Sequence, residues 1–119
     1  MNQTARAREI LRRLAIIDEG LVEGQAGLRA DPPGLSALDP KTAALLQLAV
    51  LVATGASAYS LQWGTGRALA VGASEDEIAE VLLAIAPVAG LARIVAAAPE
   101  VATALGYDIA AALEEPDGY

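Results

Sequence analysis

The sequence predicts an all-α protein: a single-domain helical bundle of about six to seven helices. Apolar residues recur every three or four positions along most of the chain, and no run shows the sustained strict alternation of a surface strand. Helix caps, prolines and glycines separate these periodic segments at helix-like spacing. The length of 119 residues suits one domain, which can bury a core without disulfides.

The first helix is expected over residues 4–18, where Ile10, Leu14 and Ile17 share one apolar stripe. The four arginines of this segment lie outside the stripe, which indicates a solvated face. Residues 19–29 contain three glycines, each unfavourable in a helix interior, so the pattern predicts at most a short, weak helix there.

The next helix is expected to be buried. A loop at residues 31–34 holds two prolines and a glycine, and beyond it Asp39 can cap a helix that has Pro40 in its first turn. From Pro40 to Thr54 the sequence is apolar nearly all round, which is typical of a helix inside a bundle or an oligomer. It is shorter than the roughly 20 apolar residues of a membrane span, so we expect no membrane insertion.

Later helices are marked by local signals. Ser74 and Glu77 form a capping-box pattern, the strongest helix-start signal in the chain. Gly72 is expected to terminate the preceding helix, while Pro87 should end one helix and Pro99 should open another. The expected helices are 56–71, 74–87, 88–97, 99–106 and a last turn at 108–113.

Composition restricts the chemistry. The chain has no cysteine and no histidine, which excludes a thiolate nucleophile, a disulfide, an imidazole base and a Cys/His metal site. We therefore expect no metal and no cofactor. A net charge of −7 argues against a nucleic-acid partner. The polar amino terminus lacks the apolar core of a signal peptide, so a cytoplasmic protein is expected.

More than half of the residues are hydrophobic, yet Phe is absent and there is a single Trp. A core of Ala, Leu, Val and Ile contributes less burial per residue than aromatic packing does. We infer that other subunits cover part of the apolar surface. The sequence thus predicts a homo-oligomer.

The order of elements from Leu38 to Ala98 resembles the carboxymuconolactone decarboxylase and alkylhydroperoxidase D family. The similarity is carried by Leu38-Asp39-Pro40-Lys41-Thr42, then Ser57-Ala58-Tyr59-Ser60-Leu61-Gln62-Trp63-Gly64, then Ala68-Leu69-Ala70-Val71-Gly72-Ala73-Ser74, then Glu77-Ile78. The resemblance implies an all-helical fold that is usually oligomeric, here a trimer or hexamer. We expect an N-terminal arm and loop at 1–37, a family-like helical core at 38–113 and a frayed tail at 114–119.

The resemblance also identifies an altered active site. Thiol members carry Cys-x-x-Cys with a histidine four residues further on and a glutamate on the preceding helix. Those positions correspond here to Ser57, Ser60, Gly64 and Ala44. Serine without an adjacent base is a poor nucleophile and cannot form a disulfide. The histidine and glutamate that decarboxylase members use are also replaced, so neither thiol peroxidase nor standard decarboxylase chemistry is expected.

The serines and aromatic residues of this segment each have two interpretations. Ser57 and Ser60 are expected to be a helix cap and a packing residue, although Ser60 is also a candidate ligand-binding residue. Tyr59 and Trp63, four residues apart, are expected to be core or interface neighbours, with the wall of a ligand cavity as the alternative. Gly64 and Gly66 either permit a close helix approach or leave room for a ligand.

Two arginines lie apart from the other basic residues. Arg67 and Arg93 occur in largely apolar stretches, where an unpaired charge is costly. Each should form an ion pair or reach water. The expected acidic partners are Glu75, Glu77, Glu80 and Glu100. The alternative is that one arginine holds the carboxylate of a small ligand.

Three functional hypotheses follow. The first is a structural or small-molecule-binding homo-oligomer that retains the family scaffold without its usual catalysis, the ligand being small and apolar or carboxylated. The second is a cofactor-free decarboxylase, isomerase or cyclase acting on a small carboxylated ring compound. It would use Arg67 or Arg93 as an anchor and Tyr59, Ser60 or a carboxylate for proton transfer. The third is a partner-binding module whose arginine-rich first helix docks on an acidic surface.

Overall fold

The computed structural model describes residues 3–16 and 37–108. The chain divides into two compact units, residues 1–39 and residues 40–119, and each is described by itself. The weak helix expected within 19–29 and the expected frayed tail lie outside the described residues. So does all but the first residue of the last turn expected at 108–113.

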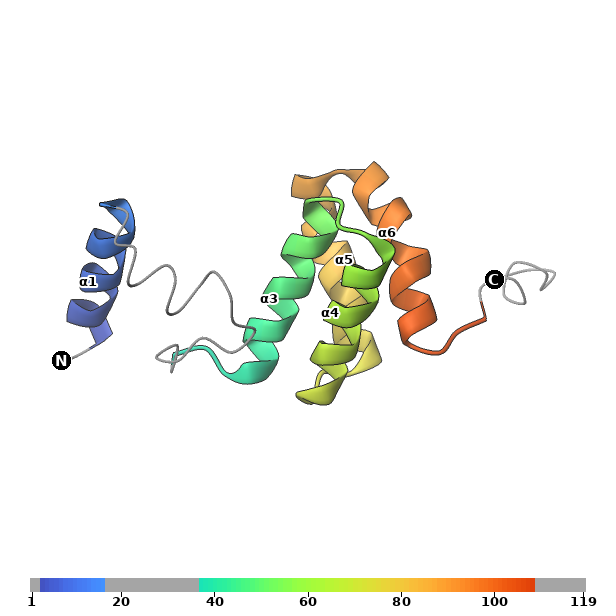
Figure 1. Ribbon diagram of the computed structural model, residues 1–119, viewed down its shortest axis with the longest axis horizontal. Coiled ribbons are helices and arrows are strands. Elements are labelled where there is room, and N and C mark those ends of the chain that lie inside the picture. Colours follow the sequence, from blue (N-terminus) through green and yellow to red (C-terminus); the bar gives the residue numbers. More distant parts are fainter. Residues whose placement is uncertain (1–2, 17–36, 109–119) are drawn as a thin grey trace. The chain divides into compact units, whose positions relative to one another are not determined.

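The described part of the first unit is α1 (Gln3–Ala15), which confirms the first predicted helix (Figure 1). Its last turn contains Arg12 and Arg13, which suit the negative end of the helix dipole. The guanidinium of Arg12 donates to the Glu9 carboxylate at 2.9 and 3.1 Å. Leu11 and Leu14 are exposed within this unit.

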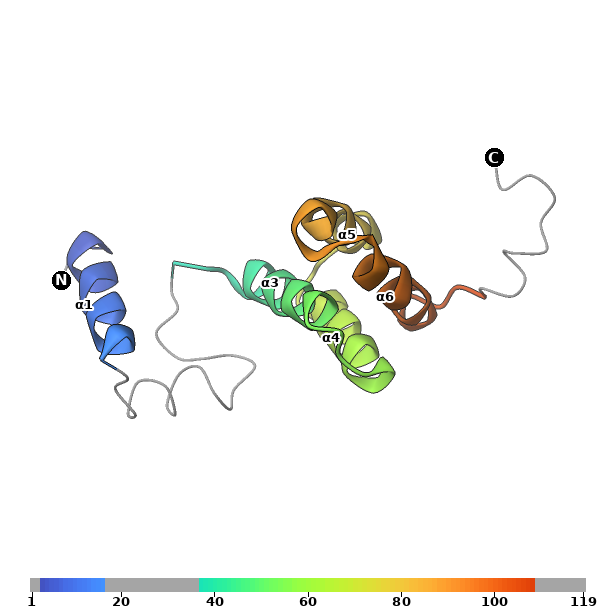
Figure 2. The ribbon, with the colours of Figure 1, turned by 90° about the horizontal axis from the view of Figure 1, so that it is seen from above.

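The second unit is a bundle of four helices: α3 (Pro40–Ala53), α4 (Ala58–Ala70), α5 (Glu75–Ala89) and α6 (Leu91–Ala104). Successive helices run in opposite directions, with α3 beside α4 and α5 beside α6 (Figures 1 and 2). The described residues contain five helices and no strand. The predicted all-α bundle is confirmed, with fewer helices in the described residues than the six to seven expected.

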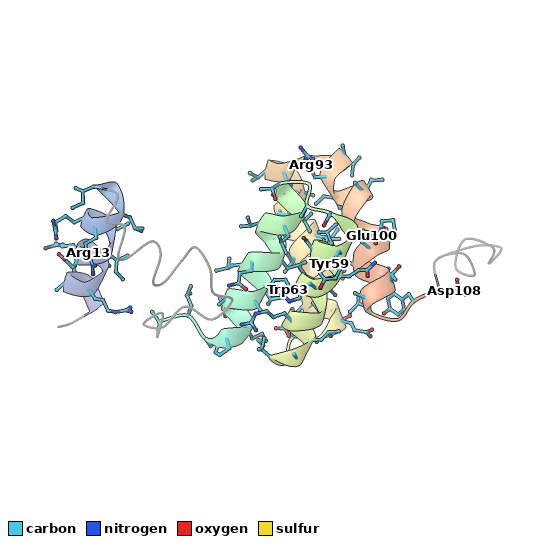
Figure 3. All side chains as sticks on the ribbon, viewed as in Figure 1. Arg13, Tyr59, Trp63, Arg93, Glu100 and Asp108 are labelled. Atoms are coloured by element: carbon cyan, nitrogen blue, oxygen red, sulfur yellow. The ribbon has the colours of Figure 1, made fainter. Side chains whose placement is uncertain are left out.

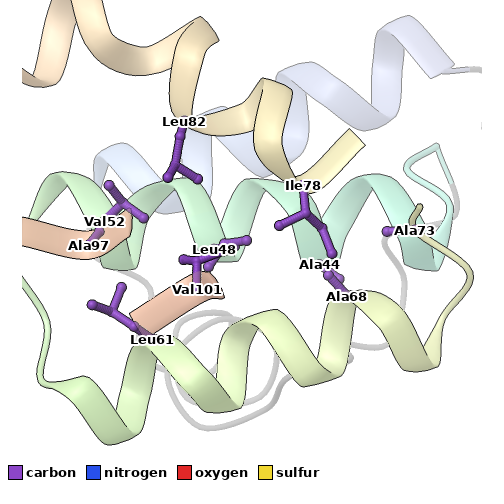
Figure 4. Close-up of a cluster of buried hydrophobic side chains, with 10 residues drawn as sticks. All are labelled: Ala44, Leu48, Val52, Leu61, Ala68, Ala73, Ile78, Leu82, Ala97 and Val101. Atoms are coloured by element: carbon purple, nitrogen blue, oxygen red, sulfur yellow. The ribbon is translucent and has the colours of Figure 1, made fainter. Parts of the chain in front are cut away.

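The core of this unit is built mainly from aliphatic side chains, as the composition predicts, and one polar side chain, Thr65, is buried with them and donates its hydroxyl to the Leu61 carbonyl at 2.8 Å. From α3, Ala44, Leu48 and Val52 point into it at intervals of four residues, so one face of the helix is completely buried. The other helices and the α4–α5 turn contribute Leu61, Ala68, Ala73, Ile78, Leu82, Ala97 and Val101 (Figure 4).

The predicted capping box is confirmed at the start of α5. The Ser74 hydroxyl accepts the backbone N–H of Glu77 at 3.0 Å, and the Glu77 carboxylate accepts the backbone N–H of Ser74 at 2.9 Å. The prediction that Gly72 terminates α4 also holds, because Gly72 follows the last turn with a φ of 97°.

Pro87 does not end α5, so that prediction is wrong. The helix continues to Ala89 and stops at Gly90, whose φ of 94° is readily adopted only by glycine. Pro87 is exposed, and so is Leu83, whose carbonyl loses its helical partner and can bond water instead. Packing of the opposite face of α5 holds the helix together through the proline.

Pro99 likewise does not divide the last segment. Most of the helix expected at 88–97 and of the short one expected at 99–106 form a single helix, α6, with Pro99 exposed in its interior, whereas Val88 and Ala89 belong to α5. Ala97 and Val101 are both buried in the core, one on either side of the proline. Burial on both sides of Pro99 therefore outweighs its unfavourable effect on the helix.

Candidate functional site

Ser57 caps α4, as predicted. Its side-chain oxygen accepts the backbone N–H of Ser60 at 3.3 Å, and the two hydroxyl oxygens lie 3.1 Å apart. Helix N-caps satisfy backbone donors that have no partner within the helix. Both hydroxyl groups are therefore engaged in local hydrogen bonds, and none of these bonds involves a base that could activate either oxygen.

Gly64 permits a close approach between α3 and α4. A Cβ atom placed on Gly64 would lie 2.8 Å from Cδ1 of Leu51 and 3.5 Å from Cδ1 of Leu48. A contact below 3 Å forces a rearrangement, so a side chain at the position that the resemblance aligns with the family histidine requires the end of the Leu51 side chain to move. Ala44, which corresponds to the family glutamate, is almost completely buried in the core.

Tyr59 and Trp63 lie on the outer face of α4 (Figure 3). Tyr59 is 79% exposed and Trp63 is 47% exposed, so neither belongs to the core of the second unit. Gly66 lies on the same side with nothing within 4 Å of an added Cβ, in contrast to Gly64. Arg67 follows one turn after Trp63, in the last turn of α4. Four of the five predicted ligand-binding residues, Ser60 included, thus lie on α4, and Tyr59, Trp63 and Arg67 follow one another at intervals of four residues.

Arg93 is not part of that group. Its guanidinium lies against Gly55, in the turn before α4, at the place where a side chain on Gly55 would begin. The positive φ of Gly55, 70°, and this contact both favour glycine there. Because Arg67 belongs to the last turn of α4, the two arginines flank opposite ends of a 13-residue helix, about 15–20 Å apart along its axis. One small ligand cannot contact both.

Two of the acids expected to pair with these arginines have other partners. The Glu77 carboxylate lies 3.0 Å from Nζ of Lys41 and links α5 to α3. The Glu100 carboxylate accepts a hydrogen bond from the Gln62 side chain at 2.8 Å, which links α6 to α4. These polar contacts hold the bundle together at its edges.

The pKa is shifted at two side chains, Glu77 in the first turn of α5 and Tyr107 beyond the end of α6. The pKa of Glu77 is lowered, chiefly because its carboxylate accepts the backbone N–H of Ser74 and also because Lys41 lies beside it. The pKa of Tyr107 is raised, first by the negative charge of Glu75. Both groups are exposed, so these shifts describe local charge and not a catalytic pair.

The structure also contains an apolar groove that the sequence does not reveal. It lies between α3 and α5, has a volume of about 600 Å³ and is bordered by Leu46 and Val50 on one side and Ile85 and Val88 on the other, with four alanines along it. Val88 is 92% exposed and Leu46 is 51% exposed. The only sequence signal was that α3 is apolar all round, which does not show which side stays open.

Among the described residues, no group of three or more acidic side chains is placed to hold a metal ion. None of the helices in residues 3–16 and 37–108 is both long and apolar enough to cross a bilayer.

The fold defines an all-α helical-bundle protein, and its chain contains no cysteine and no histidine. Comparison with known families agrees, because the model of the carboxymuconolactone decarboxylase family matches residues 9–103. The chain belongs to the carboxymuconolactone decarboxylase family. The match extends beyond the resemblance at 38–98 and begins within α1. Searches of the curated proteins and of the solved structures found no match.

Proposed function

We propose that this protein is a structural, self-associating member of its family that has neither thiol peroxidase nor standard decarboxylase activity. The observation that carries the proposal is the contact of Leu51 with Gly64. It fills the space beside the position that corresponds to the family histidine. The chain also supplies no cysteine or histidine elsewhere that could substitute. Residues 38–113 would form the scaffold that assembles.

Self-association is supported by the apolar side chains that the second unit leaves exposed. Five large apolar side chains are at least half exposed: Leu46, Val50, Leu83, Val88 and Leu91. Three of these, Leu46, Val50 and Val88, border the groove between α3 and α5. Soluble monomers rarely expose large contiguous apolar patches, because such surfaces associate in water. A homo-oligomer would remove this surface from solvent.

The loss of peroxidase activity can be tested directly. Purified protein supplied with tert-butyl hydroperoxide and dithiothreitol should consume peroxide no faster than buffer does. A Ser57→Cys/Ser60→Cys variant is the positive control, because its thiols can be oxidised and the assay must detect this. Turnover by the unmodified chain above the buffer rate would refute the proposal.

Self-association has an independent test. Light scattering at micromolar concentration should report a mass that is a multiple of the 12.1 kDa chain. A Val50→Asp/Val88→Asp variant places two charges on exposed apolar positions and should shift the mass towards the monomer, while its helical circular dichroism stays unchanged. A monomer in the unmodified protein would contradict the self-association.

A second candidate function is the binding of a small carboxylated ring compound on the outer face of α4. It is favoured by the exposed Tyr59 and Trp63 followed by the half-buried Arg67 along one helix, which offers two aromatic surfaces and a guanidinium. Trp63 is the sole tryptophan, so its fluorescence reports binding at this face. Benzoate should give a saturable change that Arg67→Gln abolishes and that Arg93→Gln, at the other end of α4, leaves intact.

A further inference from the structure

The groove between α3 and α5 has the properties of a docking site for a helix. Its lining is entirely aliphatic, no charged residue borders it, and its volume of about 600 Å³ accommodates several apolar side chains. Such grooves bind amphipathic helices, whose apolar residues at positions i, i+3, i+4 and i+7 serve as anchors. The occupant must therefore be apolar along one face.

Helix α1 has this pattern. Ala7, Ile10, Leu11 and Leu14 stand at i, i+3, i+4 and i+7 and so share one face. Leu11 is 64% exposed within its own unit. A 13-residue helix is marginally stable by itself in water, because short helices gain too few hydrogen bonds to offset nucleation. The apolar face of α1 therefore needs a surface to cover it.

The net charges of α1 and of the second unit also favour docking of α1 on the second unit. Helix α1 carries four arginines and one glutamate, whereas residues 40–119 contain nine acidic and three basic residues. Outside the lining, Glu80 lies one turn before Ala84 on α5, while Glu77, one turn further back, is paired with Lys41 of α3. The opposite end is formed by the C-termini of α3 and α5; neither helix has a basic residue in its last turn, and the Arg93 guanidinium lies against Gly55 just beyond α3. Helix C-termini carry partial negative charge, which attracts arginine.

The connecting chain is long enough to reach a neighbouring molecule. Residues 16–39 separate α1 from α3, and 24 residues can span up to about 80 Å when extended. We propose that α1 of one copy docks its apolar face in the α3–α5 groove of a second copy. This docking presupposes the self-association proposed above and assigns it a surface and an occupant.

The absence of cysteine permits a disulfide-trapping test without background. A Leu14→Cys chain is mixed with an Ala84→Cys chain that carries a size tag, and the mixture is oxidised with diamide. Because each chain has one thiol, a bond between the two different chains can only be intermolecular. The expected product is a covalent heterodimer on a non-reducing gel. The matched control is Ala5→Cys, on the opposite face of α1, which should lose this product.

Light scattering of the same samples separates the possible failures. An oligomer without preferential Leu14–Ala84 trapping would overturn the arm docking and leave self-association standing. A monomer would refute both. A chain carrying both cysteines that closes a disulfide only within itself would show that α1 occupies its own groove, and this too would overturn the docking on a second copy.

A non-covalent measurement uses the same faces. Leu14→Asp and Val50→Asp each place a charge on an exposed apolar position, so each should lose association while retaining helical circular dichroism. Mixing the two variants leaves one intact helix and one intact groove on different chains, so heterodimers should reappear. Failure of the mixture to associate, when unmodified protein does, would overturn the exchange of α1 between copies.

Discussion

The contact of α4 with α3 at Gly64 and the groove between α3 and α5 are both formed mainly by small or aliphatic residues, yet the first is closed and the second is open. At α4, the absence of a side chain on Gly64 lets Leu51 pack directly against the helix. Between α3 and α5, four alanines are too short to fill the space, and the larger side chains stand at its borders. A small residue thus closes a site when a side chain of a neighbouring helix packs against it, and leaves a groove when no neighbouring side chain is long enough to fill the space.

The largest expected effect contrasts the core with the groove on a single helix. Leu48→Ala removes a side chain that is completely buried and should lower the free energy of unfolding by about 2–5 kcal/mol. Leu46→Ala, two residues earlier on α3, removes a half-exposed groove residue and should cost about 1 kcal/mol in the monomeric bundle. Urea denaturation at low protein concentration measures both, and equal losses would contradict the distinction.

A smaller change in stability is expected at Gly64, and it tests whether packing of Leu51 closes this position of α4. Gly64→His restores the residue type of the family and should destabilise the bundle by about 1–3 kcal/mol, because its Cβ meets Leu51. In the presence of Leu51→Ala, the same substitution should cost less, which a double-mutant cycle detects as a favourable coupling.

The control for this cycle is Gly66→His on the same helix. Nothing lies within 4 Å of an added Cβ at Gly66, so the substitution should not lower stability and should not couple to Leu51→Ala. Strict additivity of Gly64→His and Leu51→Ala would show that the site tolerates a side chain, and would reopen the possibility of chemistry there.

The sequence predicts the helices whose ends carry local signals and fails where packing decides. Ser74 with Glu77, and Gly72, mark real boundaries because each satisfies or terminates hydrogen bonds within a few residues. Pro87 and Pro99 are misleading, because burial on the opposite faces of α5 and α6 carries both helices through them. The strength of that burial depends on residues distant in sequence.

The candidate site divides in the same way. The prediction that Ser57 caps α4 follows from the tendency of serine to bond to nearby backbone groups, and the structure confirms this cap. The closure at Gly64 depends on a leucine of α3, 13 positions earlier, and the periodicity of α4 cannot report it. Arg67 and Arg93 occur in similar apolar contexts, yet the fold separates them to opposite ends of α4. Only the bundle reveals that they cannot act on one ligand.

The smallest expected effect concerns the polar link at the start of the groove. Glu77 has a lowered pKa because it accepts the Ser74 N–H and faces Lys41, so its charged form is favoured by folding. That contribution is present above its ordinary pKa of 4.5 and is lost as the pH falls through the lower, folded value. The melting temperature should therefore decrease slightly over that interval, and Glu77→Gln should remove this part of the decrease.

Glu80→Gln is the matched control for charge, because it removes one carboxylate from the same helix without touching the capping box. The Glu80→Gln variant should keep the decrease in melting temperature at low pH that the Glu77→Gln variant loses. The effect is small because the Lys41–Glu77 pair is exposed, and solvent screens such pairs. If the two variants melted identically across this pH range, α3 and α5 would owe their spacing to apolar contacts alone. The groove would then be as independent of charge as the contact between Leu51 and Gly64.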